Sequence, residues 1–128
     1  MIENKKIFVI DDDMTALDIV DFLLEDEGYD VIRHSEGKSA LEDLDKQQPD
    51  LVLIDLMMPS MNGQDCIKAI REKGITIPII AFTAIDDPDI HRQAIDSGCN
   101  MVVTKPCKSN ELVAKIKSLT SATEKNSE

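Results

Sequence analysis

The sequence predicts an α/β protein in which helices cover both faces of a parallel β-sheet. Short apolar runs rich in Val and Ile, such as residues 51–54, are typical of strands buried on both faces. Between them lie segments whose apolar residues recur with a helical period. Because strand and helix alternate with short connections, we expect right-handed βαβ units and a single domain.

The first half of the chain supplies two strands and two helices. Residues 7–10, Ile-Phe-Val-Ile, form a short apolar run that predicts the first strand. Residues 14–27 place apolar side chains on one helical face and acids on the other, and Gly28 is a good helix stop. Residues 29–34 predict a second strand, and 36–47 a weaker helix.

The middle of the chain supplies the third and fourth strands. Residues 51–54 are the most apolar run, and Pro59 is expected to stop the strand that they begin. A helix follows between Gly63 and Gly74, with an apolar face. Residues 77–82 predict the next strand.

The last third completes the pattern. Residues 86–97 predict a helix with a thin apolar face, and 101–104 a fifth strand. Residues 109–119 predict the final helix, with Ser at its N-cap. We therefore assign one domain to residues 1–120, and expect the polar tail 121–128 to fray.

The charge of the chain restricts its partners. The net charge is −11 and the pI is about 4.5. This balance argues against direct binding to nucleic acid or to an anionic membrane, but it permits a divalent cation or a basic protein surface. Three cysteines without metal-ligand spacing, and an N-terminus without a signal-peptide core, favour a cytoplasmic protein.

Polar residues stand where four of the predicted strands end. Asp11 and Asp12 follow the first strand, Asp55 the third, Thr83 the fourth and Lys105 the fifth. The carboxyl ends of parallel strands form the edge where such sheets bind ligands. Clustered carboxylates repel and require a cation, and all-oxygen ligands suit Mg²⁺. A lysine and a hydroxyl beside them suit a phosphoryl group, with Asp55 as its nucleophile.

In these motifs the chain resembles the receiver domain of two-component response regulators. The matching segments are FVIDDD (8–13), LVLIDLMMPSMNG (51–63), IIAFTA (79–84) and VTKP (103–106), in the order and spacing of that family. The resemblance implies a flavodoxin-like (βα)5 sandwich of strand order 2-1-3-4-5. It also implies a signalling domain rather than an enzyme, phosphorylated on Asp55 by a histidine kinase or histidine phosphotransfer protein and acting by protein contact.

The resemblance assigns the metal ligands by position. Asp12, Asp55 and the backbone carbonyl of Met57 would bind Mg²⁺ directly, with Mn²⁺ as a possible substitute, and Asp11 would help through water. Asp13 lies beyond the family's acidic pair and is expected to be peripheral.

The resemblance also assigns the residues around the phosphoryl group. Thr83, Ala84 and Lys105 would contact its oxygens, and the Lys105–Pro106 peptide would be cis. The chain departs from the family at the switch position, where Val102 replaces an aromatic residue. Coupling between Thr83 and an aromatic rotamer is therefore not expected.

Two further positions are predicted to set the lifetime of the phosphoryl group. In the family these lie two residues after the phosphorylated Asp and two after the Thr, and here they are Met57 and Ile85. Neither side chain can hydrogen-bond an attacking water, and both are bulky enough to restrict its access. We therefore expect slow loss of phosphate.

Two other functions remain open on the sequence. A haloacid-dehalogenase-type phosphohydrolase also has an Asp nucleophile at a strand end, but needs a second Asp where this chain has Met57. A pseudo-receiver would bind partners without taking phosphate, which the intact set of Asp55, Thr83 and Lys105 disfavours.

Overall fold

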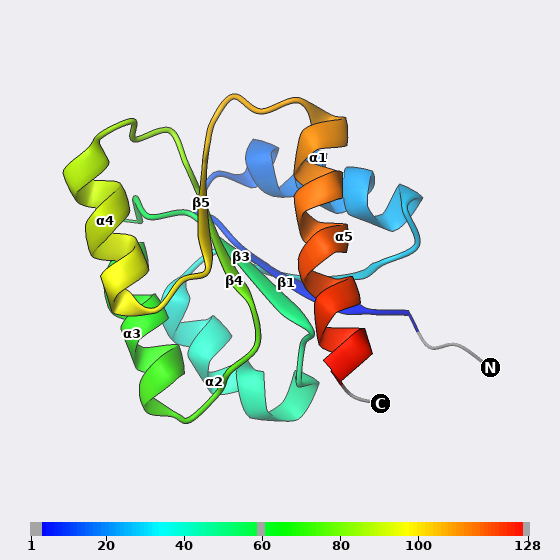
Figure 1. Ribbon diagram of the computed structural model, residues 1–128, viewed down its shortest axis with the longest axis horizontal. Helices are drawn as coiled ribbons and strands as arrows, with labels where there is room; N and C mark the ends of the chain where they lie inside the picture. Colours follow the sequence, from blue (N-terminus) through cyan, green and yellow to red (C-terminus); the bar gives the residue numbers. More distant parts are fainter. Residues whose placement is uncertain (1–3, 59–60, 127–128) are drawn as a thin grey trace.

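The computed structural model describes residues 4–58 and 61–126, in which strands and helices alternate (Figure 1). Pro59 lies outside these residues, and the third strand has already ended at Ile54. The elements are β1 Lys6–Ile10, α1 Met14–Asp26, β2 Asp30–His34, α2 Gly37–Gln47, β3 Leu51–Ile54, α3 Gly63–Glu72, β4 Ile79–Thr83, α4 Pro88–Ser97, β5 Met101–Thr104 and α5 Ser109–Asn126.

The five strands form one parallel sheet of order β2-β1-β3-β4-β5, which confirms the flavodoxin-like prediction. The chain moves outward from β1 in both directions, so β1 and β3 are neighbours that lead to opposite sides of the sheet. The crevice at such a switch point is where open α/β sheets bind ligands. Ile10 pairs with Ile54 in register, which brings the residues after β1 and β3 to the same place.

Side chains along each strand alternate between two separate apolar clusters. In β3, Leu51 and Leu53 face α1 and α5, while Val52 and Ile54 face α2, α3 and α4. Figure 1 shows α1 and α5 together on one side of the sheet. We call these the α1–α5 cluster, which includes Leu17, Val20, Leu24, Leu112 and Ile116, and the α2–α4 cluster, which includes Ala40, Leu44, Ile67, Ile70 and Ala94.

The ends of several helices follow from local capping. Asp13 was expected to be peripheral to the acidic site; its side chain accepts a hydrogen bond from Thr15 N and so caps α1. The helix before β5 begins at Pro88 rather than near residue 86, because Asp87 is its N-cap and accepts from Asp89 N.

The last helix continues to Asn126, beyond the predicted end at residue 119. Thr120 is only 4% exposed, and its hydroxyl donates to the Ile116 carbonyl at 3.0 Å. The residues that follow contain neither Gly nor Pro, so nothing in the sequence breaks the helix there. Polarity alone was therefore a poor guide to where this helix ends.

One arginine joins several chain segments at the end of the sheet where the strands begin. Arg71, in the last turn of α3, donates to the carbonyls of Ile75, Ile77 and Gly98 and to Asn100 Oδ1, at 2.8 to 3.0 Å. Arg71 occupies the Ile77 carbonyl and Pro78 has no N–H to donate, and β4 begins at Ile79 rather than at residue 77. Burial lowers the pKa of Arg71 from its ordinary value.

The three cysteines are free thiols. Cys66 and Cys99 are buried in the α2–α4 cluster, and burial raises the pKa of Cys66 to about 11. Across residues 4–58 and 61–126, no helix has the length and apolar character needed to cross a membrane.

Candidate functional site

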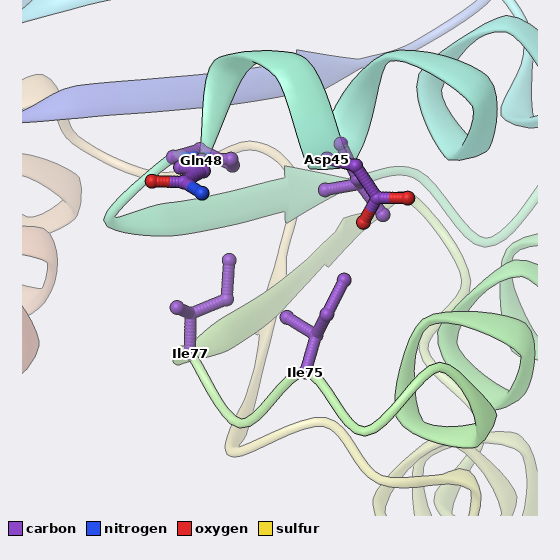
Figure 2. Close-up of a pocket in the computed structure, with 6 residues that line it drawn as sticks. Asp45, Gln48, Ile75 and Ile77 are labelled. Atoms are coloured by element: carbon purple, nitrogen blue, oxygen red, sulfur yellow. The ribbon is translucent and has the colours of Figure 1, made fainter.

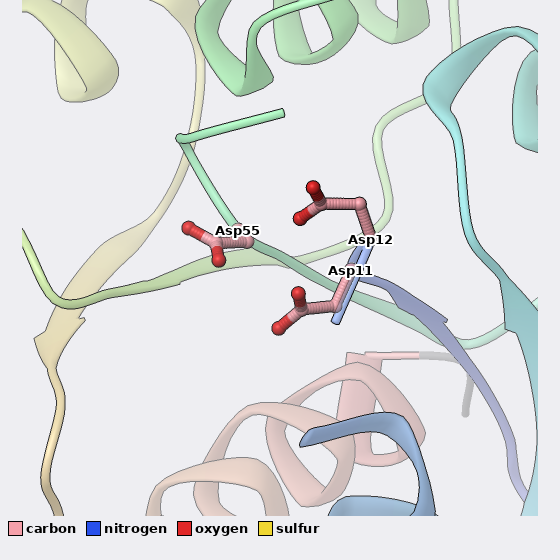
Figure 3. Close-up of side chains that lie close together, drawn as sticks. All are labelled: Asp11, Asp12 and Asp55. Atoms are coloured by element: carbon pink, nitrogen blue, oxygen red, sulfur yellow. The ribbon is translucent and has the colours of Figure 1, made fainter. Parts of the chain in front are cut away.

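Three acidic side chains lie side by side at the carboxyl edge of the sheet (Figure 3). Asp11 and Asp12 follow β1 and Asp55 follows β3, and the Asp55 backbone N–H donates to the Ile10 carbonyl at 3.0 Å. One carboxylate oxygen from each acid lies within 4.8 Å of the others. Asp11 is buried, Asp55 is half-buried and Asp12 is exposed, so the cluster opens to solvent at Asp12.

Lys105 bridges two of the three acids. Its Nζ lies 2.9 Å from Asp11 Oδ2 and 3.3 Å from Asp55 Oδ2. Burial alone would lower the pKa of Lys105, but the hydrogen bond that it donates to Asp11 and the charges of both acids outweigh burial and raise that pKa. The lysine is therefore a fixed cation, and the four groups together keep a formal charge of about −2, which a divalent cation would neutralise.

Backbone N–H groups hold the other oxygens of the same two carboxylates. Asp13 N donates to Asp11 Oδ1 and Met57 N donates to Asp55 Oδ1, both at 3.0 Å. Asp11 and Asp55 thus each place one oxygen on a backbone amide and the other on Lys105. This double contact fixes the orientation of both carboxylates.

The ends of β4 and β5 meet beside the acids. Thr83 is fully buried, its hydroxyl accepts from Ile85 N at 3.2 Å, and its carbonyl accepts from Lys105 N at 2.7 Å. Ala84 is exposed at the start of the following loop. The Lys105–Pro106 peptide is cis.

The donor set fits a hard cation. The cluster offers carboxylate oxygens only, which are the ligands that Mg²⁺ and Mn²⁺ prefer. Asp12 and Met57 line an open depression of about 510 Å³, with Leu56, Met58 and Asn62, so the cluster has room beside it for water or a phosphoryl group. The Met57 side chain is 60% exposed at its rim.

Two contacts near the site were not predicted from the sequence. The Phe82 ring lies 5.2 Å from Lys105 Nζ, a distance typical of a cation–π contact. Gly63, the first residue of α3, lies against the backbone after β3, where an added Cβ would come within 2.6 Å of Leu56 Cα. Both contacts depend on how the chain is arranged in space, which local periodicity does not encode.

The switch position does not join the site. Val102 pairs in register with Ala81 and packs, partly buried, against the α2–α4 cluster. Within residues 4–58 and 61–126, Lys105 Nζ meets the side chains of Asp11, Asp55 and Phe82.

A second cavity lies at the opposite edge of the sheet, before β3 and β4 (Figure 2). Its volume is about 280 Å³, and its lining combines apolar side chains such as Ile75 and Ile77 with Asp45 and Gln48. The Asp45 carboxylate lies 3.5 Å from Lys73 Nζ. This lining lacks the grouped acids and the buried hydroxyl of the first site.

Comparison with known proteins agrees with this geometry. The family model for the response regulator receiver domain matches residues 7–117. The chain is 34% identical over 116 residues to the alkaline phosphatase synthesis transcriptional regulatory protein PhoP of Bacillus subtilis, covering 91% of this chain and 48% of PhoP. It therefore spans about half the length of that curated relative.

Solved structures of receiver domains also match this chain over most of its length. The receiver domain of Francisella response regulator 1452 is 30% identical, with a TM-score of 0.88 over 94% of this chain and 99% of that one. A CheY-like receiver domain protein from Methanospirillum hungatei JF-1 is 26% identical, with a TM-score of 0.90 over 97% and 99%. With the matching fold and the acids in place, this chain belongs to the response regulator receiver domain family of two-component signalling.

Proposed function

We propose that this receiver takes a phosphoryl group onto Asp55 from the phosphohistidine of a histidine kinase or phosphotransfer protein, with Mg²⁺ bound. The observation that carries the proposal is the bridge of Lys105 between Asp11 and Asp55, beside the exposed Asp12. This bridge leaves a preorganised anionic site, and its formal charge of about −2 matches that of one divalent cation.

Each residue has a defined part in this transfer. Asp12, Asp55 and the Met57 carbonyl would hold the cation, with Asp11 acting through water; the cation would neutralise charge on the phosphoryl oxygens. An Asp55 oxygen forms the new O–P bond as the N–P bond to the donor histidine breaks, and the electron pair stays on that nitrogen. Lys105, the Thr83 hydroxyl and the Ala84 amide would receive the phosphoryl oxygens.

Incubation with acetyl phosphate and Mg²⁺, followed by intact mass measurement, tests the proposal. The wild type should gain one phosphoryl group, and Asp55→Asn should gain none. Asp12→Ala should fold normally, because Asp12 is the most exposed of the three acids. It should lose Mg²⁺ binding, because it removes a proposed direct ligand. If Asp12→Ala titrates with Mg²⁺ like the wild type, the ligand assignment is wrong.

The same experiment separates the alternatives. A pseudo-receiver would gain no mass under any condition. A phosphohydrolase would turn over acetyl phosphate repeatedly, and this is the less favoured alternative because the residue two positions after Asp55 is Met57, with no carboxylate to act as acid.

We further propose that the signal leaves through α4. Ala94 is the buried residue of this helix, while Ile95 is 45% exposed, so α4 is held by little apolar contact and can shift. Hydrogen exchange with and without beryllofluoride should then differ across residues 86–104. Equal protection in both states would reject this role. The switch position holds Val102, so α4 would have to shift without an aromatic switch residue.

A further inference from the structure

The loop between β4 and α4 is held at Ile85 from both sides. Ile85 N–H donates to Thr83 Oγ1 at 3.2 Å, and the Ile85 carbonyl lies 2.6 Å from His91 Nε2. A carbonyl oxygen only accepts, so Nε2 of His91 carries the hydrogen. The two bonds fix both peptide groups that flank the Ile85 Cα.

His91 is well placed to hold this loop. Its ring is half-buried on the first turns of α4, and its backbone N–H also donates to the Asp87 carbonyl at 3.0 Å. The bond to Asp87 is the first backbone hydrogen bond of α4, so the contact specific to the His91 side chain is the one to the Ile85 carbonyl. Ile85 and Ile90 also pack, partly buried, against the α2–α4 cluster, and the His91 bond adds a polar contact that fixes the direction of the Ile85 carbonyl.

The hydrogen bond from the Ile85 N–H also restricts the direction in which the Thr83 hydroxyl can donate. Because this oxygen accepts the Ile85 N–H, its own hydrogen is left to donate elsewhere. Thr83 is fully buried, so its hydroxyl can turn only within the space that the loop leaves. A displaced Ile85 would remove the contact that orients it.

We propose that His91 is a positioning residue: through the Ile85 carbonyl it holds the β4–α4 loop so that the Thr83 hydroxyl donates toward the phosphoryl group. This inference rests on the proposed function of Asp55. His91 does not touch the reacting atoms; it acts through Ile85 on Thr83.

Two substitutions of His91 test the role. His91→Phe keeps a flat ring but removes the donor, whereas His91→Gln places an amide N–H near the position of Nε2. Gln93→Leu, an exposed change on the same helix, controls for nonspecific effects on α4. Losing one hydrogen bond corresponds to roughly a three- to tenfold change in rate.

The first measurement uses the unphosphorylated protein. Amide exchange at Ile85 should be faster in His91→Phe, and restored toward the wild-type rate in His91→Gln. Urea unfolding of each variant shows whether the whole fold has weakened. Exchange at Ile85 that is unchanged in His91→Phe would overturn the positioning role, whatever happens to phosphate.

The second measurement follows loss of phosphate after the acetyl phosphate donor is removed. His91→Phe should lose it roughly three- to tenfold faster than the wild type, with His91→Gln and Gln93→Leu near the wild-type rate. An unchanged lifetime in His91→Phe, or no rescue by Gln, would refute the proposal. A wild type that takes no phosphate would instead refute the function proposed for Asp55.

Discussion

Replacing Gly63 by Ala should disturb the phosphorylation site through the backbone. Gly63 N donates to the Leu56 carbonyl at 2.9 Å, and its α-carbon lies against the chain that leaves β3. A Cβ there would be 2.6 Å from Leu56 Cα, and closer still to the Asp55 carbonyl oxygen. Both neighbours are backbone atoms, so the methyl group cannot be accommodated by turning a side chain.

The size of the effect follows from that distance. Ordinary contact begins at 3.4 Å, so Leu56 and the start of α3 must separate by at least about 0.8 Å. Overpacking of this kind costs about 1–3 kcal/mol of stability. Misplacing a reacting group by about 1 Å can cost on the order of 100-fold in rate. We therefore expect phosphorylation of Asp55 to slow by roughly 10- to 100-fold.

The control is Gly28→Ala, which has no atom within 4 Å of its new Cβ but a φ of +93°. It should cost about 1–2 kcal/mol through backbone strain alone, and leave phosphorylation unchanged. Urea unfolding gives the stabilities, and mass measurement with acetyl phosphate gives the rates. If Gly63→Ala is phosphorylated as fast as Gly28→Ala, the close contact at Asp55 does not position the site.

Four further results are expected. Since the pKa of Cys66 is about 11, about one molecule in a thousand carries its thiolate at pH 8, and a thiol reagent should label the half-buried Cys107 first. The folded protein holds the Cys66 proton more tightly than the unfolded chain, so stability should be unaffected below about pH 9 and fall as the pH rises toward 11, as urea titrations at each pH would show. Arg71→Met should cost on the order of 3 kcal/mol in urea unfolding, because four hydrogen bonds are lost, and Arg71→Lys less. Phosphate on the wild type should last minutes to hours, and Met57→Asn with Ile85→Glu should shorten this by up to about 100-fold; a wild-type half-life of seconds would contradict the shielding argument.

The sequence was sufficient to predict the architecture and the place of the acids. Strands such as Leu51–Ile54 are buried on both faces, so their apolar runs are unambiguous. Parallel pairing then brings every strand's carboxyl end to one edge, and Asp11 and Asp55 must lie close together. What carried the prediction was the position of each residue after its strand.

The contacts that cross between elements could not be predicted in this way. The Phe82 ring meets Lys105, Arg71 meets Gly98, and His91 meets the Ile85 carbonyl. Each depends on side-chain direction and loop shape, which periodicity does not encode. The end of α5 was missed for a different reason: Thr120 is polar, yet it is buried and satisfied by its own helix.

The division of the interior by the sheet has a consequence for how this protein can diverge. The α1–α5 cluster and the α2–α4 cluster share no side chain, because successive residues of each strand point to opposite faces. Substitutions in different clusters should therefore combine additively, whereas substitutions within one cluster should compensate or aggravate each other. Mutations can thus accumulate on one face while the packing of the other, and the acids at the shared edge, are preserved.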